Sequence, residues 1–204
     1  MRGIGSAERA AFLLCRPRRT GGGVASAARD PDVGIPDVAD VARRLSPRAR
    51  VLDLGCGDGI PISRFLVREG FNVVALDSSP EMIARYRAHF PDVPTRCTRA
   101  EEADFPTESF EAVVAWGVLF HLPAAKQRVV IRKVASWLKP GGLFLFTSAE
   151  VKGATEGELN EVTFHYISLG VGGYRDVIEN TGMRLQTSHH DAWDNFVYVA
   201  EKTA

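Results

Sequence analysis

Glycines and two acidic residues stand at spacings that suit the binding of a nucleotide-like ligand. Asp53 is followed by Gly55, Gly57 and Gly59, and Asp77 lies 22 residues beyond Gly55. Glycine lets the backbone turn sharply and lets a ligand approach the main chain. A carboxylate at the end of the next apolar run, as at Asp77, can accept hydrogen bonds from both hydroxyls of a ribose. The stretch therefore predicts a nucleotide-like ligand that lies over the end of a strand.

The spacing of the glycines separates two classes of cofactor. A dinucleotide site has the pattern G-x-G-x-x-G, and Ile60 stands where its third glycine belongs. The pattern found is acid-x-G-x-G-x-G, followed by the apolar run 73–77, which ends in an acid. Together these features resemble the class I S-adenosylmethionine-dependent methyltransferases, over roughly residues 35–150. The resemblance implies S-adenosylmethionine as the cofactor and a Rossmann-like methyltransferase fold.

The same resemblance implies the cofactor contacts. They fall on Asp53, Gly55, Cys56, Gly57, Asp77, Ser78, Met82, Ala100, Glu101, Trp116 and Gly117. Asp53 either orients the glycine turn or meets the methionine ammonium, directly or through water. For Met82 and Trp116 ordinary packing is the alternative, and for Glu101 a solvated acidic loop is the alternative.

The loop 115–122 corresponds to the part of the family that flanks the methyl acceptor. Methyltransferases of base amines and glutamine amides often carry an Asn/Asp-Pro-Pro-aromatic motif there, and this sequence has none. A formal net charge of zero also argues against nucleic acid, so we expect a small-molecule acceptor. His121 is the candidate general base, with a loop-holding hydrogen bond as its alternative role. His165 and Tyr166 are candidate acceptor-binding residues.

Composition sets further limits on the class of protein. With 204 residues, 45% of them hydrophobic, the chain suits a single globular core. No apolar run approaches the roughly 18 residues of a membrane-spanning helix. The 3 cysteines are odd in number and lack metal-ligand spacing, which favours a reducing, cytoplasmic location. The 5 histidines are scattered, so no metal site is expected, and the oligomeric state stays open.

The elements that position these residues follow from the periodicity of the apolar residues. Strands ending near positions 54, 77, 98, 116 and 148 alternate with helical periods. Residues 183–189 and 195–201 predict a closing antiparallel hairpin, whereas 150–170 show no clear pattern. The alternation predicts an α/β fold: a doubly wound, mostly parallel seven-stranded sheet with helices on both faces. Ligands of such sheets bind beyond the carboxyl ends of the strands, where the candidate residues fall.

The first part of the chain differs from the rest. Residues 1–29 carry 6 arginines against 1 acid, a net charge of +5. Such a start is typical of an organelle transit peptide, but we favour a flexible or atypical segment over 1–33 and a methyltransferase domain over 34–204. Many members of the resembled family close an aromatic N-terminal helix over the cofactor, and no such aromatic pattern is visible here.

These expectations combine into one function with two alternatives. The chain is expected to transfer a methyl group from S-adenosylmethionine to an oxygen or nitrogen of a small molecule, in an in-line displacement. Its main tasks are then to orient donor and acceptor and to exclude water. The alternatives are a non-catalytic S-adenosylmethionine-binding domain and, disfavoured by Ile60, a nicotinamide-dependent oxidoreductase.

Overall fold

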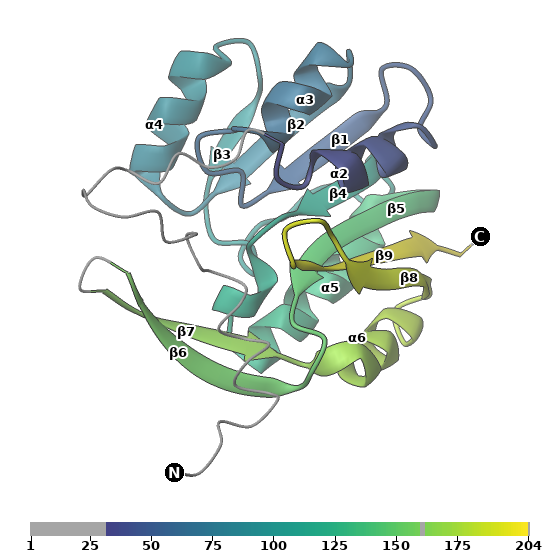
Figure 1. Cartoon of the computed structure of the whole chain (residues 1–204). Coiled ribbons are helices and arrows are strands. Elements are labelled where there is room, and N and C mark those ends of the chain that lie inside the picture. Colours follow the sequence, from purple (N-terminus) through teal and green to yellow (C-terminus); the bar gives the residue numbers. More distant parts are fainter. Residues whose placement is uncertain (1–31, 160–161, 204) are drawn as a thin grey trace.

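A computed structural model describes residues 32–159 and 162–203, in which seven strands form the main sheet (Figure 1). The strands are β1 Arg50–Leu54, β2 Asn72–Asp77, β3 Thr95–Cys97, β4 Phe110–Ala115, β5 Leu138–Ser148, β8 Met183–His190 and β9 Phe196–Lys202. Their order is β3-β2-β1-β4-β5-β9-β8, and β9 is antiparallel to both of its neighbours while the others pair in parallel. This confirms the predicted doubly wound α/β fold. The strand order reverses between β1 and β4, so ligands are expected beyond the carboxyl ends at that point.

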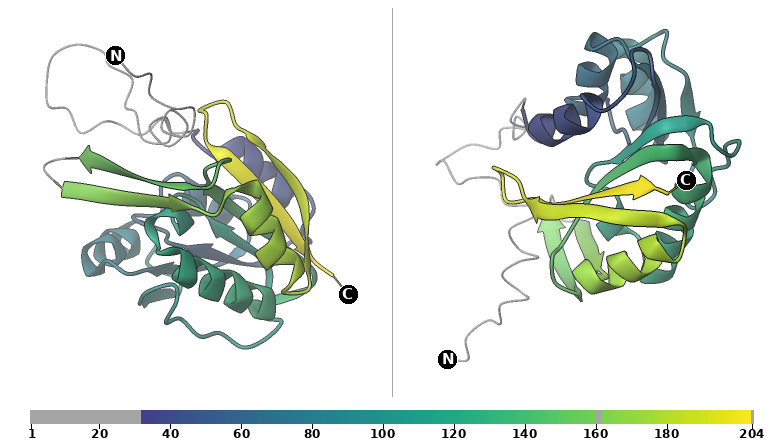
Figure 2. Two further views of the ribbon diagram at one scale, coloured as in Figure 1. Left: turned by 90° about the horizontal axis from the view of Figure 1, so that it is seen from below. Right: turned by 90° about the vertical axis from the view of Figure 1, so that its right-hand side faces the viewer.

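Helices cover both faces of the main sheet (Figure 2). They are α2 Ile35–Ala42, α3 Ile62–Arg68, α4 Pro80–His89, α5 Ala124–Trp137 and α6 Gly170–Glu179, with the short 3-10 helix η1 Leu119–His121. On one face, Val38 of α2 and Leu66 of α3 belong to the same buried cluster as Val114 of β4. On the other face, α5 and α6 pack through residues such as Val134 against Phe144 of β5. Successive residues of each inner strand therefore pack into the clusters on opposite faces of the sheet. Because both faces are buried, these strands are continuous apolar runs.

The start of α4 follows directly from its sequence and fixes the region beyond Asp77. Ser79 is the N-cap, and its Oγ accepts a hydrogen bond from the N–H of Met82 at 3.3 Å. Pro80 occupies the first helical position and Glu81 lies in the first turn, near the positive end of the helix dipole. The helix therefore begins within three residues of the acid that ends β2.

Two strands within residues 150–170 form a separate hairpin. Strand β6, Gly153–Leu159, pairs antiparallel with β7, Val162–Ser168, and the pair projects away from the main sheet (Figure 1). Thr155 lies opposite Tyr166, and Glu156 opposite His165. Because successive strand positions face opposite sides, Tyr166 and His165 lie on different faces of the hairpin. β7 packs against η1, next to the loop that follows β4.

Some boundaries differ from the sequence-based expectation. The apolar run 143–148 predicts a strand over those residues, whereas β5 begins at Leu138, because Leu138 pairs with Phe110 ahead of an irregularity in the ladder. Residues 1–31, which carry most of the predicted atypical segment 1–33 and the transit-peptide alternative, lie outside the described residues. The domain assignment 34–204 therefore stays a prediction. None of the helices described here is long and apolar enough to cross a membrane.

Candidate functional site

The glycine turn closes onto the end of β2, which brings the turn and the second acid together. The N–H groups of Gly55 and Cys56 donate to the carbonyl of Leu76, at 2.7 and 2.9 Å. The N–H of Gly57 donates to Oδ2 of Asp77 at 2.9 Å. The turn and the carboxylate therefore form one wall at the carboxyl edge of β1 and β2.

Asp77 retains capacity to bind a ligand. Its Oδ1 accepts a hydrogen bond from the N–H of Ser79 at 2.8 Å, and its side chain is half-buried. A carboxylate offers about four lone-pair sites, so two beyond these bonds can receive the hydroxyls of a ribose. Ser78 beside it is exposed, and Met82 in the first turn of α4 is half-buried. The donor set here fits a sugar diol.

The three glycines of the turn have different surroundings. A Cβ at Gly55 would lie 2.2 Å from Cγ2 of Val118, and one at Gly59 would lie 2.5 Å from the ring of Phe90. Both glycines also have φ near +80°, at +78° and +85°, so packing and conformation require them. At Gly57, φ is +56° and open space surrounds the Cβ position. That space lets a ligand approach the main chain.

Asp53 ties the end of β1 to α3 and α4 through a buried chain of hydroxyls. Ser63 Oγ donates to Oδ2 of Asp53 at 2.6 Å, and the hydroxyl of Tyr86 donates to Ser63 Oγ at 2.7 Å. Burial is the main cause that raises the pKa of Asp53 to about 7. The negative charge of Asp77 raises this pKa further, and the hydrogen bond from Ser63 lowers it in part. Sequence reasoning missed Ser63 and Tyr86. A serine in the first turn of the helix that follows the glycines, next to the apolar Ile62, is the signal that would have found Ser63.

Glu101, in the segment that follows β3, carries a buried oxygen without a hydrogen-bond partner among the described residues. Its Oε1 accepts from Nζ of Lys126 at 2.6 Å, while Oε2 is buried and without a hydrogen-bond partner in the part of the chain that the structure describes. Burial alone would raise the pKa of Glu101, but the hydrogen bond from Lys126, a hydrogen bond from its own backbone and the charges of Lys126 and Arg99 together hold the pKa below its ordinary value. A charged oxygen in this state is costly unless a ligand donates to it. The exocyclic amino group of an adenine fits that need, and Ala100 beside Glu101 is buried.

Trp116 and Gly117 follow the end of β4. A Cβ at Gly34, just before α2, would lie 2.7 Å from Cε2 of Trp116, so the start of α2 packs against the indole. Trp116 also contacts the buried cluster shared by α2 and α3. The N–H of Gly117 donates to Oγ1 of Thr147 at 2.9 Å, which fixes the loop against β5. At least part of the Trp116 ring is therefore engaged in packing, which is the alternative to a cofactor contact.

Three rings gather where the loop after β4 meets β7. The centroid of the Phe120 ring lies 4.5 Å from that of His121 and 5.6 Å from that of Tyr166, and the His121 and Tyr166 rings are 5.2 Å apart. His121 is exposed, yet desolvation by the surrounding protein lowers its pKa below the ordinary 6.5. Its imidazole is therefore neutral at neutral pH and able to accept a proton.

The structure does not bring His165 to this cluster. His165 lies on the opposite face of the hairpin, where its Nδ1 is 3.1 Å from Oε1 of Glu156 and both side chains are exposed. Of the residues predicted to bind the acceptor, His121 and Tyr166 are in contact with each other, whereas His165 lies away from both. Successive side chains of a strand point to opposite faces, and this explains why His165 and Tyr166 are separated. The sequence did not show that residues 162–168 form a strand, so this separation could not be predicted from it.

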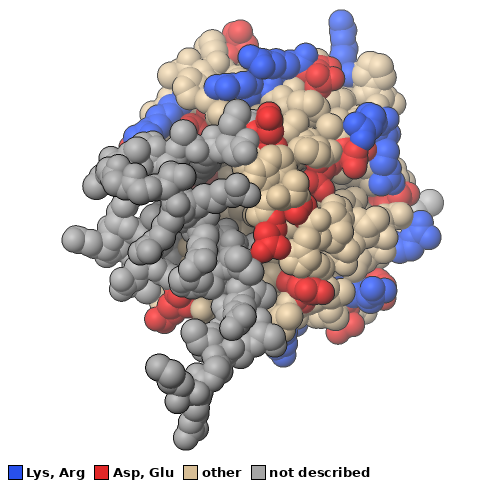
Figure 3. Space-filling view, in the orientation of Figure 1, with Lys and Arg blue, Asp and Glu red and all other residues tan. Residues whose placement is uncertain are grey.

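Other histidines lie at the turn between β8 and β9. His189 Nε2 is 2.8 Å from Oδ1 of Asp37, and His190 lies between Glu150 and Asp194, at 3.5 and 3.1 Å. Among residues 32–159 and 162–203, no three His, Cys, Asp or Glu side chains are arranged to hold a metal ion. Figure 3 shows acidic side chains toward the middle of one face and Lys and Arg mainly around its rim, with no continuous basic surface on the described part of that face.

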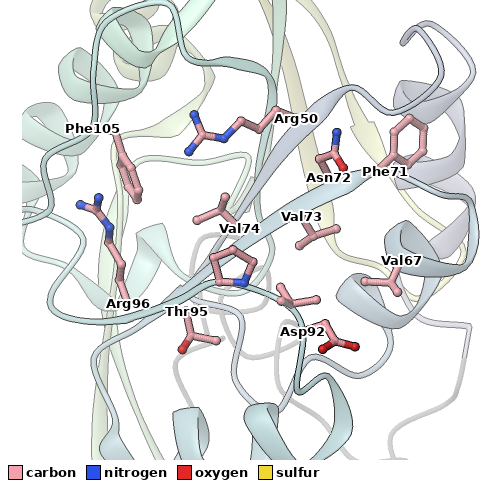
Figure 4. A pocket seen from close by; sticks show the side chains of 12 residues that line it. Arg50, Val67, Phe71, Asn72, Val73, Val74, Asp92, Thr95, Arg96 and Phe105 are labelled. Carbon is pink, nitrogen blue, oxygen red and sulfur yellow. The ribbon is translucent and has the colours of Figure 1, made fainter.

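A cavity of about 400 Å³ lies at the other end of the sheet (Figure 4). It borders the first residues of β1, β2 and β3, and Arg50 and Arg96 stand on one side of it. These guanidinium groups stack on Phe110 and Phe105, at 4.6 and 4.2 Å, and so cover the aromatic end of the core. Since ligands of such sheets bind at the carboxyl ends, we assign this cavity no part in the site.

Comparison with known proteins adds the class of chemistry. The chain matches the family model of a methyltransferase domain over residues 51–142. The ubiquinone biosynthesis O-methyltransferase of Xanthomonas axonopodis pv. citri (strain 306) is 33% identical over 186 residues, which cover 80% of this chain and 76% of that protein.

Solved structures share the fold at lower sequence identity. CalS10, an amino pentose methyltransferase from Micromonospora echinaspora determined with S-adenosylmethionine, has a TM-score of 0.72 and 16% identity, over 100% of this chain and 99% of that one. The 1,6-didemethyltoxoflavin-N1-methyltransferase of Burkholderia thailandensis has a TM-score of 0.70 and 19% identity, over 88% and 82%. At these identities the likeness concerns the fold.

Proposed function

The chain belongs to the class I S-adenosylmethionine-dependent methyltransferase family, and we propose that this enzyme methylates a hydroxyl oxygen of a small aromatic molecule. The sequence leaves oxygen and nitrogen open, and two observations favour an aromatic hydroxyl. The relative from Xanthomonas is named as an O-methyltransferase of ubiquinone biosynthesis. In this chain the rings of Phe120, His121 and Tyr166 gather on the acceptor side. This cluster is the observation that carries the proposal, since a planar acceptor can pack against such rings.

The donor side supplies the residues that would hold the cofactor. Asp77 would accept hydrogen bonds from the ribose, the main chain at Gly57 would meet the amino-acid part, and Oε2 of Glu101 would accept from the adenine amino group. When bound, S-adenosylmethionine supplies an electrophilic methyl group on a sulfonium. The remaining work of the protein is to orient the acceptor oxygen and to keep water out.

His121 is the proposed general base. A hydroxyl that attacks the methyl group must lose its proton, and a neutral imidazole beside the acceptor can take it. The lowered pKa of His121 keeps this side chain unprotonated at neutral pH. Tyr166, whose ring centroid is 5.2 Å from that of His121, contacts the imidazole and would form part of the same wall beside the acceptor.

Macromolecular acceptors and other locations fit less well. The formal net charge of zero and the mixed charges of Figure 3 disfavour a nucleic-acid substrate. Free Cys56 and Cys97, with no disulfide among the described residues, favour a reducing, cytoplasmic location. The family assignment argues against a nicotinamide-dependent oxidoreductase. Detection of a methylated product would exclude a non-catalytic S-adenosylmethionine-binding domain.

The test is an acceptor panel. Purified protein is incubated with S-adenosylmethionine and separate sets of phenols, amines and carboxylic acids, and methylated products are detected by mass spectrometry. We expect product from phenols. Product from amines alone would contradict the proposed acceptor, and binding of S-adenosylhomocysteine without any product would support the non-catalytic alternative.

Two histidine variants sharpen the result. His121→Ala should lower methyl transfer to phenols by about 100-fold, a usual loss for a general base. His165→Ala, on the other face of the hairpin, is the matched control and should leave transfer nearly unchanged. Equal losses in both variants would contradict the role proposed for His121.

A further inference from the structure

One fully buried amide joins the loop after β4 to strand β7 of the hairpin. Gln127, in the first half of α5, has no solvent-exposed area. Its Nε2 donates to the carbonyl of Leu122 and to the carbonyl of Ile167, each at 2.8 Å. Its Oε1 accepts from the hydroxyl of Tyr174 at 2.6 Å. Both donors of the amide and its oxygen are thus engaged.

The two carbonyls belong to the residues directly after the two acceptor-side residues. Leu122 follows His121 in the loop beyond β4, and Ile167 follows Tyr166 in β7. Both carbonyls bind the same nitrogen, which fixes their separation. The loop and the hairpin strand come from segments about 45 residues apart in the chain, so this link is a tertiary constraint rather than a local one.

The third bond connects the amide to the end of β5. The hydroxyl of Tyr174 lies 2.6 Å from Oγ of Ser148, and Ser168 Oγ at the root of the hairpin donates to the carbonyl of Ala149 at 2.8 Å. The root of the hairpin is therefore held against the main sheet. Its strands lie outside that sheet, so their placement depends on contacts of this kind.

We propose that Gln127 is a positioning residue that holds His121 against Tyr166 and so determines the shape of the wall against which the acceptor packs. The pocket itself rests on the proposed function, whereas the positioning of the two rings does not. Apolar packing alone would allow the loop and the hairpin to shift, while an amide with two donors on two carbonyls selects one separation. Removing the donors deprives two part-buried carbonyls of this partner, which the structure can relieve by moving them toward water.

The test uses two variants and a control. Gln127→Met keeps the length of the side chain but has no donor, and Gln127→Glu keeps an acceptor for Tyr174 but cannot donate to both carbonyls. Gln186→Met, which removes a glutamine of β8 that bonds to Glu201, is the matched control. NMR titration of His121 reports the closeness of Tyr166 without needing an acceptor, and calorimetry with S-adenosylhomocysteine reports the donor site.

The expected result separates positioning from general stability. In both Gln127 variants the pKa of His121 should rise toward its ordinary value as the hairpin withdraws, kcat/KM for a phenol should fall by about 100-fold, and the Kd of S-adenosylhomocysteine should stay within about twofold. The control should change none of these. An unchanged pKa of His121 in folded variants would overturn the proposal, as would failure of both variants to fold, since Gln127 would then support the whole domain.

The outcome for Gln127 is distinguishable from that for the acceptor. If no phenol is methylated but the pKa of His121 still rises in the Gln127 variants, the positioning holds and the proposed acceptor fails. If phenols are methylated and the pKa does not move, the acceptor holds and the positioning fails.

Discussion

Replacing Asp53 with asparagine should make the protein's stability less dependent on pH. Asp53 is 2% exposed, and its carboxyl accepts from Ser63 in a chain that continues to Tyr86. An asparagine oxygen can accept the same hydrogen bond and carries no charge. The substitution therefore removes the cost of ionising a buried carboxyl while it retains the contact.

The size of the effect follows from the pKa values. Burial raises the pKa of Asp53 from 3.8 to about 7 in the folded protein. Between these values the unfolded chain releases a proton that the folded chain keeps, so the free energy of unfolding falls as pH rises through this range. The loss is complete above about pH 7 and amounts to about 4 kcal/mol. Asp53→Asn should escape this loss, so that its stability relative to the wild type improves by about 4 kcal/mol from pH 4 to pH 8.

Urea unfolding of both proteins at pH 4, 6 and 8 measures this difference, because the other titrating groups are common to both. Asp58→Asn, which removes a half-buried acid of the same turn, shows the ordinary effect of deleting a carboxylate there. A gap between wild type and Asp53→Asn that stays constant over this range would refute the reasoning. It would show that Asp53 ionises in the folded protein as readily as in the unfolded chain.

Three further changes test other parts of the site. Asp77→Ala should weaken binding of S-adenosylhomocysteine by about 100-fold in calorimetry, because two charge-assisted hydrogen bonds to the ribose are lost; unchanged affinity would remove the proposed donor site. Gly34→Ala should lower the free energy of unfolding by about 2 kcal/mol in urea, since its φ is +78° and the new Cβ would press on Trp116; an unchanged midpoint would contradict that packing. Methyl transfer to a phenol should rise with pH through a pKa below 6.5 as His121 loses its proton, and His121→Ala should abolish this step in a pH–rate profile.

The donor half of the site could be predicted because it depends on short-range patterns. The acid-x-G-x-G-x-G run and the apolar strand that ends at Asp77 each lie within a few residues, and parallel strands necessarily bring their carboxyl ends to one edge. The hydrogen bond between Gly57 and Asp77 is the direct result. The cofactor contacts themselves stay predictions.

The acceptor half depends on contacts that periodicity does not encode. Residues 153–159 and 162–168 form strands that alternate polar and apolar positions irregularly, and Tyr166 and His165, as neighbours in one strand, lie on opposite faces. Gln127 is one polar residue in an amphipathic helix, and only tertiary structure shows that it faces the core. The chain from Asp53 through Ser63 to Tyr86 likewise joins three separate elements.

The separate β6–β7 hairpin allows the two halves of the enzyme to change independently. It enters the chain between β5 and α6, contributes no strand to the seven-stranded sheet, and carries Tyr166 to its place from outside. Transplanting another hairpin onto the same two junctions would leave the glycine turn and Asp77 intact. Natural or laboratory evolution could thus give this catalyst new substrates by exchanging one segment while the methyl source stays the same.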